Sequence, residues 1–376
     1  MLLSEDHRAV QDAVRAYVQD HIAPRAGAWD KTHQFPKTEL RGLAELGCYG
    51  VAVPTDRGGA GLDYLALAVI LEEIAAGDGA TSTVVSVTNC PVCSILMAGA
   101  DEAQIQAWLA PLARGAMLGA FCLTQPHAGS QADGIKTTAT RHGDDYVLDG
   151  VKQFITSGKN GDVAIVMAVT DKAAGKRGIS AFVVPTDSAG YTVARLENKM
   201  GQHASDTAQI VFENCRVPAS QRLGEEGQGL KIALSGLEGG RIGIAAQSIG
   251  MARAAFEAAL HYAKERVAFG RPIYEHQAVQ FRLAEMATQI EAAWQLTHHA
   301  ASLKDAGVPC LKEAAMAKLF ASEMAEQVCS AAIQVFGGYG YVSDFPVERI
   351  YRDVRVCQIY EGTSDVQKIL IGRALA

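Results

Sequence analysis

The sequence predicts an α+β protein of three blocks, in which a β domain separates two helical domains. Apolar residues recur at helical spacing up to about residue 119, and short β-favouring runs separated by glycine, aspartate and asparagine follow. Long alanine-rich stretches then continue to the C-terminus. Because the chain has 376 residues and 49% hydrophobic content, it can bury a substantial core. We therefore expect domains at residues 1–119, 120–222 and 223–376.

The N-terminal block should begin with a helix. Ser4 is a typical N-cap, acidic residues follow it in the first turn, and Val10, Val14 and Tyr17 continue at helical spacing. This start lacks the charged leader and apolar run of an export signal, so we expect a cytoplasmic protein. No apolar run is expected to reach the roughly 20 residues that a membrane span needs.

The middle block should form a β domain. Runs rich in valine, isoleucine and phenylalanine at residues 163–167, 181–184 and 210–212 are typical of strands, and turn-forming residues separate them. The C-terminal block should form a four-helix-like bundle, because Met316, Phe320 and further apolar residues repeat every four positions. Close-packing, alanine-lined helices also favour a homo-oligomer.

Charge and cysteine content exclude several classes of protein. The formal charge of −7 and the pI near 5.8 argue against a nucleic-acid binder, which would normally be basic. Among eight cysteines, Cys90 and Cys93 have the C-x-x-C spacing, but no second such pair accompanies them. We therefore expect reduced thiols and no metal site.

Two loop-like segments in the middle block could contact a ligand. Residues 121–130 combine a strand-like start with proline, glycine and hydroxyl residues, and residues 152–158 end similarly and contain the aromatic ring of Phe154. Backbone N–H groups and hydroxyls in such loops can bind a polar or heteroaromatic ligand. Each segment taken alone is equally compatible with an ordinary turn beside a strand.

Three segments in the C-terminal block are also ambiguous when taken singly. Residues 334–341 contain three glycines within four positions, which permits close approach to a pyrophosphate or simply ends a helix. Residues 266–272 place two arginines beside a phenylalanine, as a phosphate site or a solvated helix end would. Residues 360–364 place Glu361 before a glycine and two hydroxyls, which suits either a general base or a helix-capping turn.

In their order and separation, these segments together resemble the acyl-CoA dehydrogenase family, and the resemblance runs almost end to end. It is greatest to the short-chain and short/branched-chain members, on residues 237–246. Six segments are similar to family motifs. In the middle block these are residues 123–131 (L-T-E-P-x-x-G-S-D), 152–158 (K-x-W-I-T-N-G) and 199–207 (K-x-G-x-x-x-S-x-T). In the C-terminal block they are residues 266–270 (R-x-x-F-G), 334–341 (Q-x-F-G-G-x-G-Y) and 352–363 (R-D-x-R with I-Y-E-G-T).

The resemblance implies a helical N-terminal domain, a β-barrel-like middle domain and a C-terminal four-helix bundle, usually assembled as a homotetramer. It also implies FAD bound between the β domain and the C-terminal helices, with part of the site contacting the FAD of a neighbouring subunit. The residues so assigned to FAD are Phe121, Leu123, Thr124, Gly129, Ser130, Phe154, Ile155, Thr156, Arg266, Phe269, Gln277, Gln334, Val335, Gly337, Gly338, Thr363 and Asp365.

The resemblance makes Glu361 the base that removes the α-proton of an acyl-CoA thioester while the β-hydrogen leaves as hydride to flavin N5. The backbone N–H of Glu361 would help to polarise the thioester carbonyl. A desolvated carboxylate should also have a raised pKa. Some members carry the base on a helix directly before an arginine, where this chain has Gly240. Ser130, Glu238, Arg241 and Gly362 would contact the acyl-CoA, with Arg241 anchoring its CoA portion.

The chain departs from the family pattern at three positions: Gln125 and Gln131 replace acidic residues, and Phe154 replaces a tryptophan. We expect a short or short-branched acyl-CoA as substrate, the trans-2-enoyl-CoA as product and an electron-transferring flavoprotein as acceptor. The alternatives are an acyl-CoA oxidase, a flavin-dependent desulfinase-like relative, or a non-catalytic component that binds acyl-CoA or flavin.

Overall fold

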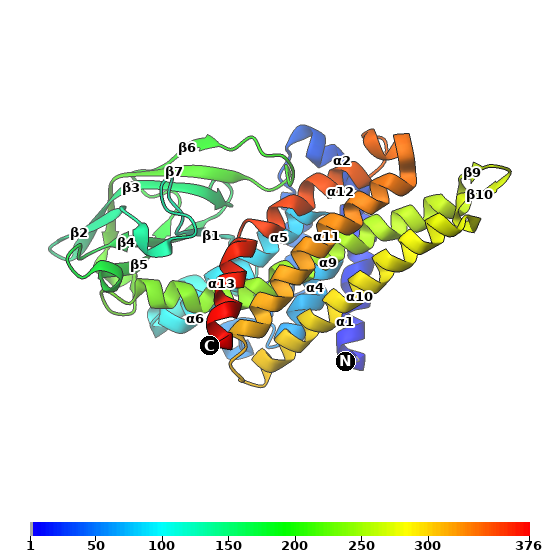
Figure 1. The fold of residues 1–376 in the computed structure, drawn as a ribbon. Helices are drawn as coiled ribbons and strands as arrows, with labels where there is room; N and C mark the ends of the chain where they lie inside the picture. Colours follow the sequence, from blue (N-terminus) through cyan, green and yellow to red (C-terminus); the bar gives the residue numbers. More distant parts are fainter. Residues whose placement is uncertain (1–2) are drawn as a thin grey trace.

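The computed structural model describes residues 3–376 and confirms the expected order of helical, β and helical regions (Figure 1). The β domain lies at one end of the molecule, and the helices of both termini pack side by side along the rest of it. Leucine, alanine and valine side chains from the N-terminal and C-terminal helices share one buried core. The two helical regions therefore form a single layered unit around α9 (Gly229–Glu265).

Side-chain caps define where the N-terminal helices begin. The Ser4 hydroxyl accepts from the backbone N–H of His7, as expected, while Asp63 and Asp78 cap α4 and α5 in the same way. The N-terminal α-helices are α1 (Glu5–Tyr17), α2 (Ala23–Thr32), α3 (Lys37–Glu45), α4 (Tyr64–Gly77), α5 (Gly79–Val87), α6 (Ser94–Gly99), α7 (Glu102–Gln104) and α8 (Ala110–Ala113). Short π-helical segments, η1 (Val18–Ile22), η3 (Thr88–Cys93) and η4 (Ile105–Leu109), link several of them.

One continuous helix, Gly79–Gly99, is long and apolar enough to cross a membrane by length and composition, with a mean hydropathy of 1.4. The expectation that no run reaches this length was wrong, because the polar residues that interrupt the segment are uncharged. In the structure 72% of the most apolar window is buried inside the protein, against α9 and strand β1 (Gly119–Cys122). This helix is part of the core.

The β domain is an eight-stranded sheet, mostly antiparallel, in the order β6-β7-β3-β2-β4-β5-β8, with β1 parallel to β4. Even-numbered residues of β4, such as Val166, face an inner core shared with β3 and β7, and odd-numbered ones face the helices. Both faces of β4 and β5 are thus covered, which explains their continuous apolar runs. The other strands are β2 (Thr138–His142), β3 (Asp145–Thr156), β4 (Val163–Val169), β5 (Ile179–Pro185), β6 (Tyr191–Leu196), β7 (Thr207–Pro218) and β8 (Arg222–Leu223).

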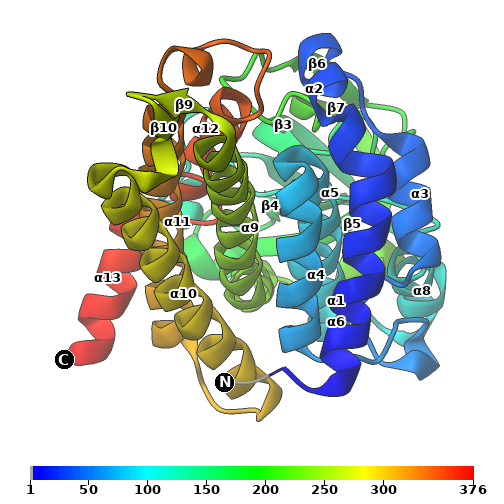
Figure 2. The ribbon, with the colours of Figure 1, turned by 90° about the vertical axis from the view of Figure 1, so that its right-hand side faces the viewer.

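The two long C-terminal helices run lengthwise beside α9, whereas the last helix crosses it (Figures 1 and 2). Here α10 (Gln277–Asp305) and α11 (Leu311–Phe336) pack on α9, and α13 (Ser364–Leu375) packs on α11. A two-stranded hairpin, β9 (Val267–Ala268) with β10 (Arg271–Pro272), projects beyond the far end of α9. The remaining elements are α12 (Val347–Val354) and the 3₁₀ segments η9 (Gly337–Tyr341) and η10 (Arg355–Gln358).

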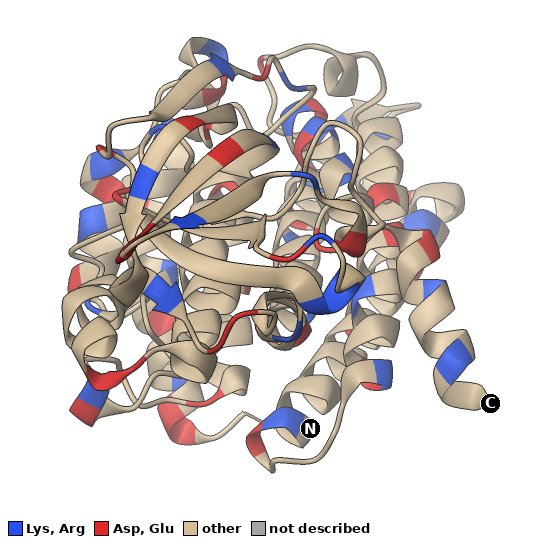
Figure 3. Ribbon diagram, turned by 90° about the vertical axis from the view of Figure 1, so that its left-hand side faces the viewer, with Lys and Arg blue, Asp and Glu red and all other residues tan. Residues whose placement is uncertain are grey.

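All eight cysteines are buried and free. Basic and acidic residues alternate along the ribbon on the side of the molecule that carries the β domain (Figure 3). Within residues 3–376 no three His, Cys, Asp or Glu side chains are grouped as a metal site requires.

Candidate functional site

Glu361 lies on a strained turn between η10 and α13. Its φ is +54°, a left-handed conformation that is uncommon outside glycine, and Gly362 follows with φ +89°. The Thr363 hydroxyl then caps α13 by accepting from the N–H of Val366 at 3.3 Å. Backbone strain of this kind persists only where surrounding contacts enforce it, and it is concentrated at functional sites.

Two buried side chains enforce the turn. The Lys318 ammonium on α11 donates to the Gly362 carbonyl at 2.6 Å, and the Gln367 amide donates to the same carbonyl at 2.9 Å. Gln367 also donates to the Glu361 carbonyl at 3.3 Å. Both side chains are fully buried, so water does not replace these bonds.

The Glu361 carboxylate fills the space left by a missing side chain on α9. A Cβ atom added to Gly240 would lie 2.0 Å from Glu361 Oε2 and 2.7 Å from its carboxyl carbon. Although Glu361 as a residue is only partly buried, Oε2 itself is buried and forms no hydrogen bond. Position 240, the alternative position for a base, is therefore filled by the carboxylate of Glu361 itself.

Burial raises the pKa of Glu361 to about 7, while the positive charges of Arg241 and Lys318 oppose the rise. A carboxylate with a pKa near the working pH combines a large ionised fraction with increased basicity. Cys90 on η3 also lies within the field of Glu361, and burial raises its own pKa beyond the neutral range. The cysteine therefore stays neutral and adds no charge to the site.

Arg241 follows Gly240 on α9 and is only 6% exposed. Its Nε and Nη1 atoms are buried without a hydrogen-bond partner. Burial lowers the pKa of Arg241, and Glu361 and Glu238 act in the opposite direction. A buried guanidinium with two unused donors is poised to bind an acceptor from a ligand.

Glu238 also lies on α9, but it faces α10. Its carboxylate pairs with Lys304 of α10 at 3.0 Å, and the Lys304 ammonium stands 4.8 Å from the ring centre of Tyr64. A Cβ atom added to Gly239 would lie 2.8 Å from the Tyr64 ring. Tyr64 thus closes the space beside this turn of α9, where α4, α9 and α10 meet.

A buried polar network lies behind the turn. The Tyr360 hydroxyl donates to Gln247 at 2.5 Å, and the Gln247 amide donates to Thr83 at 2.6 Å. The Thr83 hydroxyl donates to Gln202 at 2.7 Å, and the backbone N–H of Gln202 donates to Asp353. These bonds connect α5, α9 and the loop before β7 to the segment that carries Glu361, which restricts its position.

The sequence interpretation missed Lys318, Gln367 and this network. A signal for Lys318 was present, because it shares one helical face with Ala314, Ala321 and Ala325, all fully buried. A lysine in the middle of an alanine-lined face needs a buried partner. Its partner, the Gly362 carbonyl, is 44 residues away in sequence and could not be identified from the pattern.

Two of the predicted segments meet in the β domain. The buried Lys152 ammonium donates to the Leu123 carbonyl at 3.1 Å, and the Gln153 N–H donates to the Thr124 carbonyl at 2.9 Å. Phe154 has φ +59° and is 63% exposed, so its ring projects from the strand. Nearby, the Ser157 hydroxyl is buried without a partner.

The replacement of an acidic residue at Gln125 has a structural explanation. Gln125 is 3% exposed, its amide donates to the Thr137 hydroxyl at 2.6 Å, and its oxygen accepts from the Lys136 N–H at 2.7 Å. The amide therefore closes the loop without burying a charge. Gln131 is exposed, and nothing in the structure explains its replacement.

The other predicted residues of the β domain differ in exposure. Ile155 is buried and pairs with Ala208 of β7, which places its side chain in the inner core. Gly129 and Ser130 are exposed at the tip of the loop. Phe121 and Thr156 are partly buried.

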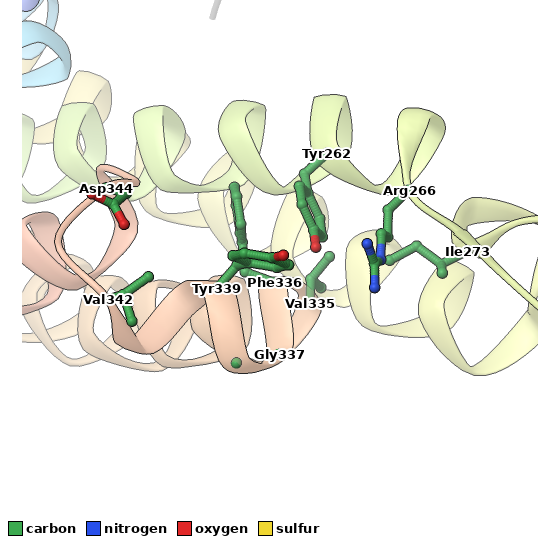
Figure 4. A pocket seen from close by; sticks show the side chains of 10 residues that line it. Tyr262, Arg266, Ile273, Val335, Phe336, Gly337, Tyr339, Val342 and Asp344 are labelled. Carbon is green, nitrogen blue, oxygen red and sulfur yellow. The ribbon is translucent and has the colours of Figure 1, made fainter.

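A third group of predicted residues lines a pocket of about 560 Å³ at the far end of α9 and α11 (Figure 4). Arg266 lies there, 5.7 Å from the ring centre of Tyr339, beside Val335, Gly337 and Gly338. Phe269 is 96% exposed on the projecting hairpin, and Gln277 begins α10. Gln334 lies one position before Val335 on α11, and Asp365 is exposed on α13.

The pocket at Arg266 lies far from the Glu361 site of the same chain. Arg241 and Arg266 are 25 positions apart on one helix, which corresponds to about 38 Å at about 1.5 Å per residue. A ligand held at Arg266 is therefore far from the Glu361 carboxylate of the same chain. The two groups can act on one molecule only if a second subunit supplies one of them.

Comparison with known proteins places almost the whole chain in one family. Family models described as the N-terminal, middle and C-terminal domains of acyl-CoA dehydrogenase match residues 4–116, 120–215 and 227–376. The human mitochondrial short-chain specific acyl-CoA dehydrogenase is 44% identical over 98% of this chain and 90% of its own length.

Two solved structures superpose over the whole chain. Butyryl-CoA dehydrogenase from Megasphaera elsdenii is 41% identical, with a TM-score of 0.98 over 100% of this chain and 99% of its own. A chain from a structure of the electron transferring flavoprotein of Acidaminococcus fermentans is 44% identical, with the same TM-score and coverage. The chain therefore belongs to the acyl-CoA dehydrogenase family, whose members are oxidoreductases that act on acyl-CoA.

Proposed function

We propose that the protein catalyses the FAD-dependent α,β-dehydrogenation of a short or short-branched acyl-CoA to the trans-2-enoyl-CoA, with Glu361 as the base. The observation that carries this proposal is the Glu361 carboxylate, which is buried above Gly240 with an unbonded oxygen and a pKa near 7. Such a group can accept a proton from a weakly acidic carbon acid only if the substrate carbonyl is polarised at the same time.

The chain provides the groups for this polarisation. The backbone N–H of Glu361 donates no hydrogen bond within residues 3–376, so it is available to a thioester oxygen. Lys318 and Gln367 hold the carbonyls of the same turn, which fixes the direction of the N–H. The positive charge of Arg241 opposes the rise in the pKa of the carboxylate and so favours its ionised form.

The β-domain residues fit FAD. The exposed Phe154 ring can lie against a planar ring system, and the unpartnered Ser157 hydroxyl offers a hydrogen bond to a bound ligand. Thr124, Ser130 and Thr156 would supply further contacts from the segments that Lys152 and Gln153 connect, and Thr363 would add one from the start of α13. When bound, FAD supplies the acceptor for the β-hydrogen and its electron pair.

The proposed substrate is short because Tyr64 occupies space beside Gly239, next to the Glu361 site. The substrates named for the relatives, a short-chain specific acyl-CoA dehydrogenase and a butyryl-CoA dehydrogenase, support the same size class. Glu238 is already paired with Lys304, so we propose for it only a secondary contact with the acyl-CoA.

We also propose that the protein is a homotetramer and passes electrons to an electron-transferring flavoprotein. The roughly 38 Å between Arg241 and Arg266 supports an oligomer in which the Arg266 pocket contacts FAD of a neighbouring subunit. The match to a chain in the structure of an electron transferring flavoprotein supports the acceptor.

The visible spectrum of the purified protein and an anaerobic titration with butyryl-, isobutyryl-, 2-methylbutyryl-, isovaleryl- and octanoyl-CoA test the proposal. We expect a flavin band near about 450 nm that one of the short thioesters bleaches. A flavin that none of them bleaches would contradict the proposed substrates. Rapid re-oxidation by air alone would instead identify an oxidase, and absence of flavin would favour a binding component.

A further inference from the structure

We propose that Lys318 is a positioning residue for the reaction, because its ammonium group fixes the turn that carries Glu361 and places a positive charge behind the carboxylate. This inference rests on the proposed role of Glu361 as base. Lys318 donates to the Gly362 carbonyl, so it would act through the turn and its charge.

Burial of the Lys318 ammonium costs free energy. Lys318 is fully buried in the middle of α11 and forms no ion pair within residues 3–376. Its ammonium donates to the Gly362 carbonyl at 2.6 Å. A buried ammonium without a carboxylate bonded to it is costly, and an uncharged side chain would pack against its alanine neighbours at lower cost.

Lys318 also holds a strained turn in place. Glu361 and Gly362 both have positive φ, and the Gly362 carbonyl accepts from Lys318 and from Gln367. Loss of one donor would leave the carbonyl less constrained and allow the strained turn to relax. Relaxation would move the carboxylate away from the space above Gly240.

Lys318 also acts on Glu361 through its charge. Arg241 from α9 and Lys318 from α11 are the positive groups that act on Glu361, and both oppose the increase in its pKa caused by burial. The charges or titratable groups around Lys318 are Cys357 on η10, Glu361 and Arg241, and burial lowers the pKa of Lys318 to about 8. The charges of Glu361 and Lys318 therefore each favour the ionised form of the other.

The test uses the FAD-loaded, full-length protein with Lys318→Met, Lys318→Gln and Lys318→Arg. Lys368→Met is the matched control, since Lys368 follows Gln367 on α13 but points outward and is 56% exposed. Two quantities are measured: the pH dependence of anaerobic flavin bleaching by butyryl-CoA, and hydrogen–deuterium exchange of the backbone amides in residues 359–366.

The acidic limb of the pH profile is the range in which the bleaching rate rises with pH. For Lys318→Met we expect this limb to move to a higher pH by about one unit. The rate at its optimum should fall about 10- to 100-fold, and the turn should exchange faster. Lys318→Gln should show the shifted limb with less change in exchange, because it retains a donor without the charge. Lys318→Arg should restore the limb, and Lys368→Met should match the wild type.

A wild-type limb in both Lys318→Met and Lys318→Gln would overturn the electrostatic role, and unchanged exchange in Lys318→Met would overturn the positional one. If Lys318→Met does not fold, Lys318→Gln still tests the limb. Wild-type protein that no acyl-CoA bleaches would contradict the proposed function instead, and the exchange measurement would still decide whether Lys318 fixes the turn.

Discussion

Replacing Gly240 with alanine should displace the base without touching its chemistry. The added Cβ would lie 2.0 Å from Glu361 Oε2, whereas ordinary contacts begin near 3.4 Å, so the carboxylate must move by more than 1 Å. A misplacement of about 1 Å costs about 100-fold in rate, equivalent to about 2.7 kcal/mol of transition-state stabilisation. Alanine also favours a helix by about 0.5–1 kcal/mol over glycine, which offsets part of the crowding.

The assay is the single-turnover rate of flavin bleaching by butyryl-CoA under anaerobic conditions, together with the midpoint of urea unfolding. We expect Gly240→Ala to lose about 100-fold in rate while its unfolding free energy changes by less than about 2 kcal/mol. Gly372→Ala on α13 is the control, because a Cβ there meets no atom within 4 Å. A wild-type rate in Gly240→Ala would show that the carboxylate does not occupy this space in the working enzyme.

Three further predictions concern Glu361, Arg241 and Gln125. Because the pKa of Glu361 is raised to about 7 from an ordinary value near 4.5, the folded state binds the extra proton between these values. Its stability should therefore fall by at most about 3 kcal/mol as pH rises from 4.5 to 7. Urea unfolding of Glu361→Gln should lack this loss, and an unchanged pH dependence would contradict the burial of the carboxylate. Arg241→Gln should move the acidic limb of the bleaching rate upward, since Arg241 opposes the raised pKa; a limb at the wild-type pH would exclude this role. Gln125→Met should destabilise the protein by about 2 kcal/mol, because the buried Thr137 hydroxyl loses its donor and the Lys136 N–H loses its acceptor, and an unaltered urea midpoint would argue against these bonds.

Periodicity and composition were sufficient to predict the three blocks, because helical and strand patterns are local. The continuous apolar runs of β4 and β5 follow from helices covering one face and the inner core the other. The same local approach failed for residues 79–99, where uncharged polar residues lie within a long buried helix. Hydropathy along the chain does not show what packs against a segment.

The candidate site was predicted through family resemblance and not from local pattern. Glu361 beside Gly362 is compatible with an ordinary capping turn, and only the fold brings it onto Gly240, 121 positions earlier. Lys318 and the Thr83–Gln247–Tyr360 network escaped prediction for the same reason, since their partners are distant in sequence. The single-chain separation of Arg241 and Arg266 likewise emerged only when both were placed on one helix.

The most direct measurement of the central claim compares Glu361→Gln with the wild type in the anaerobic butyryl-CoA titration, with acyl-CoA binding followed by calorimetry. Glutamine keeps the size and turn of Glu361 but cannot accept the α-proton. We expect FAD content and acyl-CoA binding to stay close to wild type while bleaching of the flavin band is abolished. Bleaching of Glu361→Gln at the wild-type rate would contradict the assignment of Glu361 as the base.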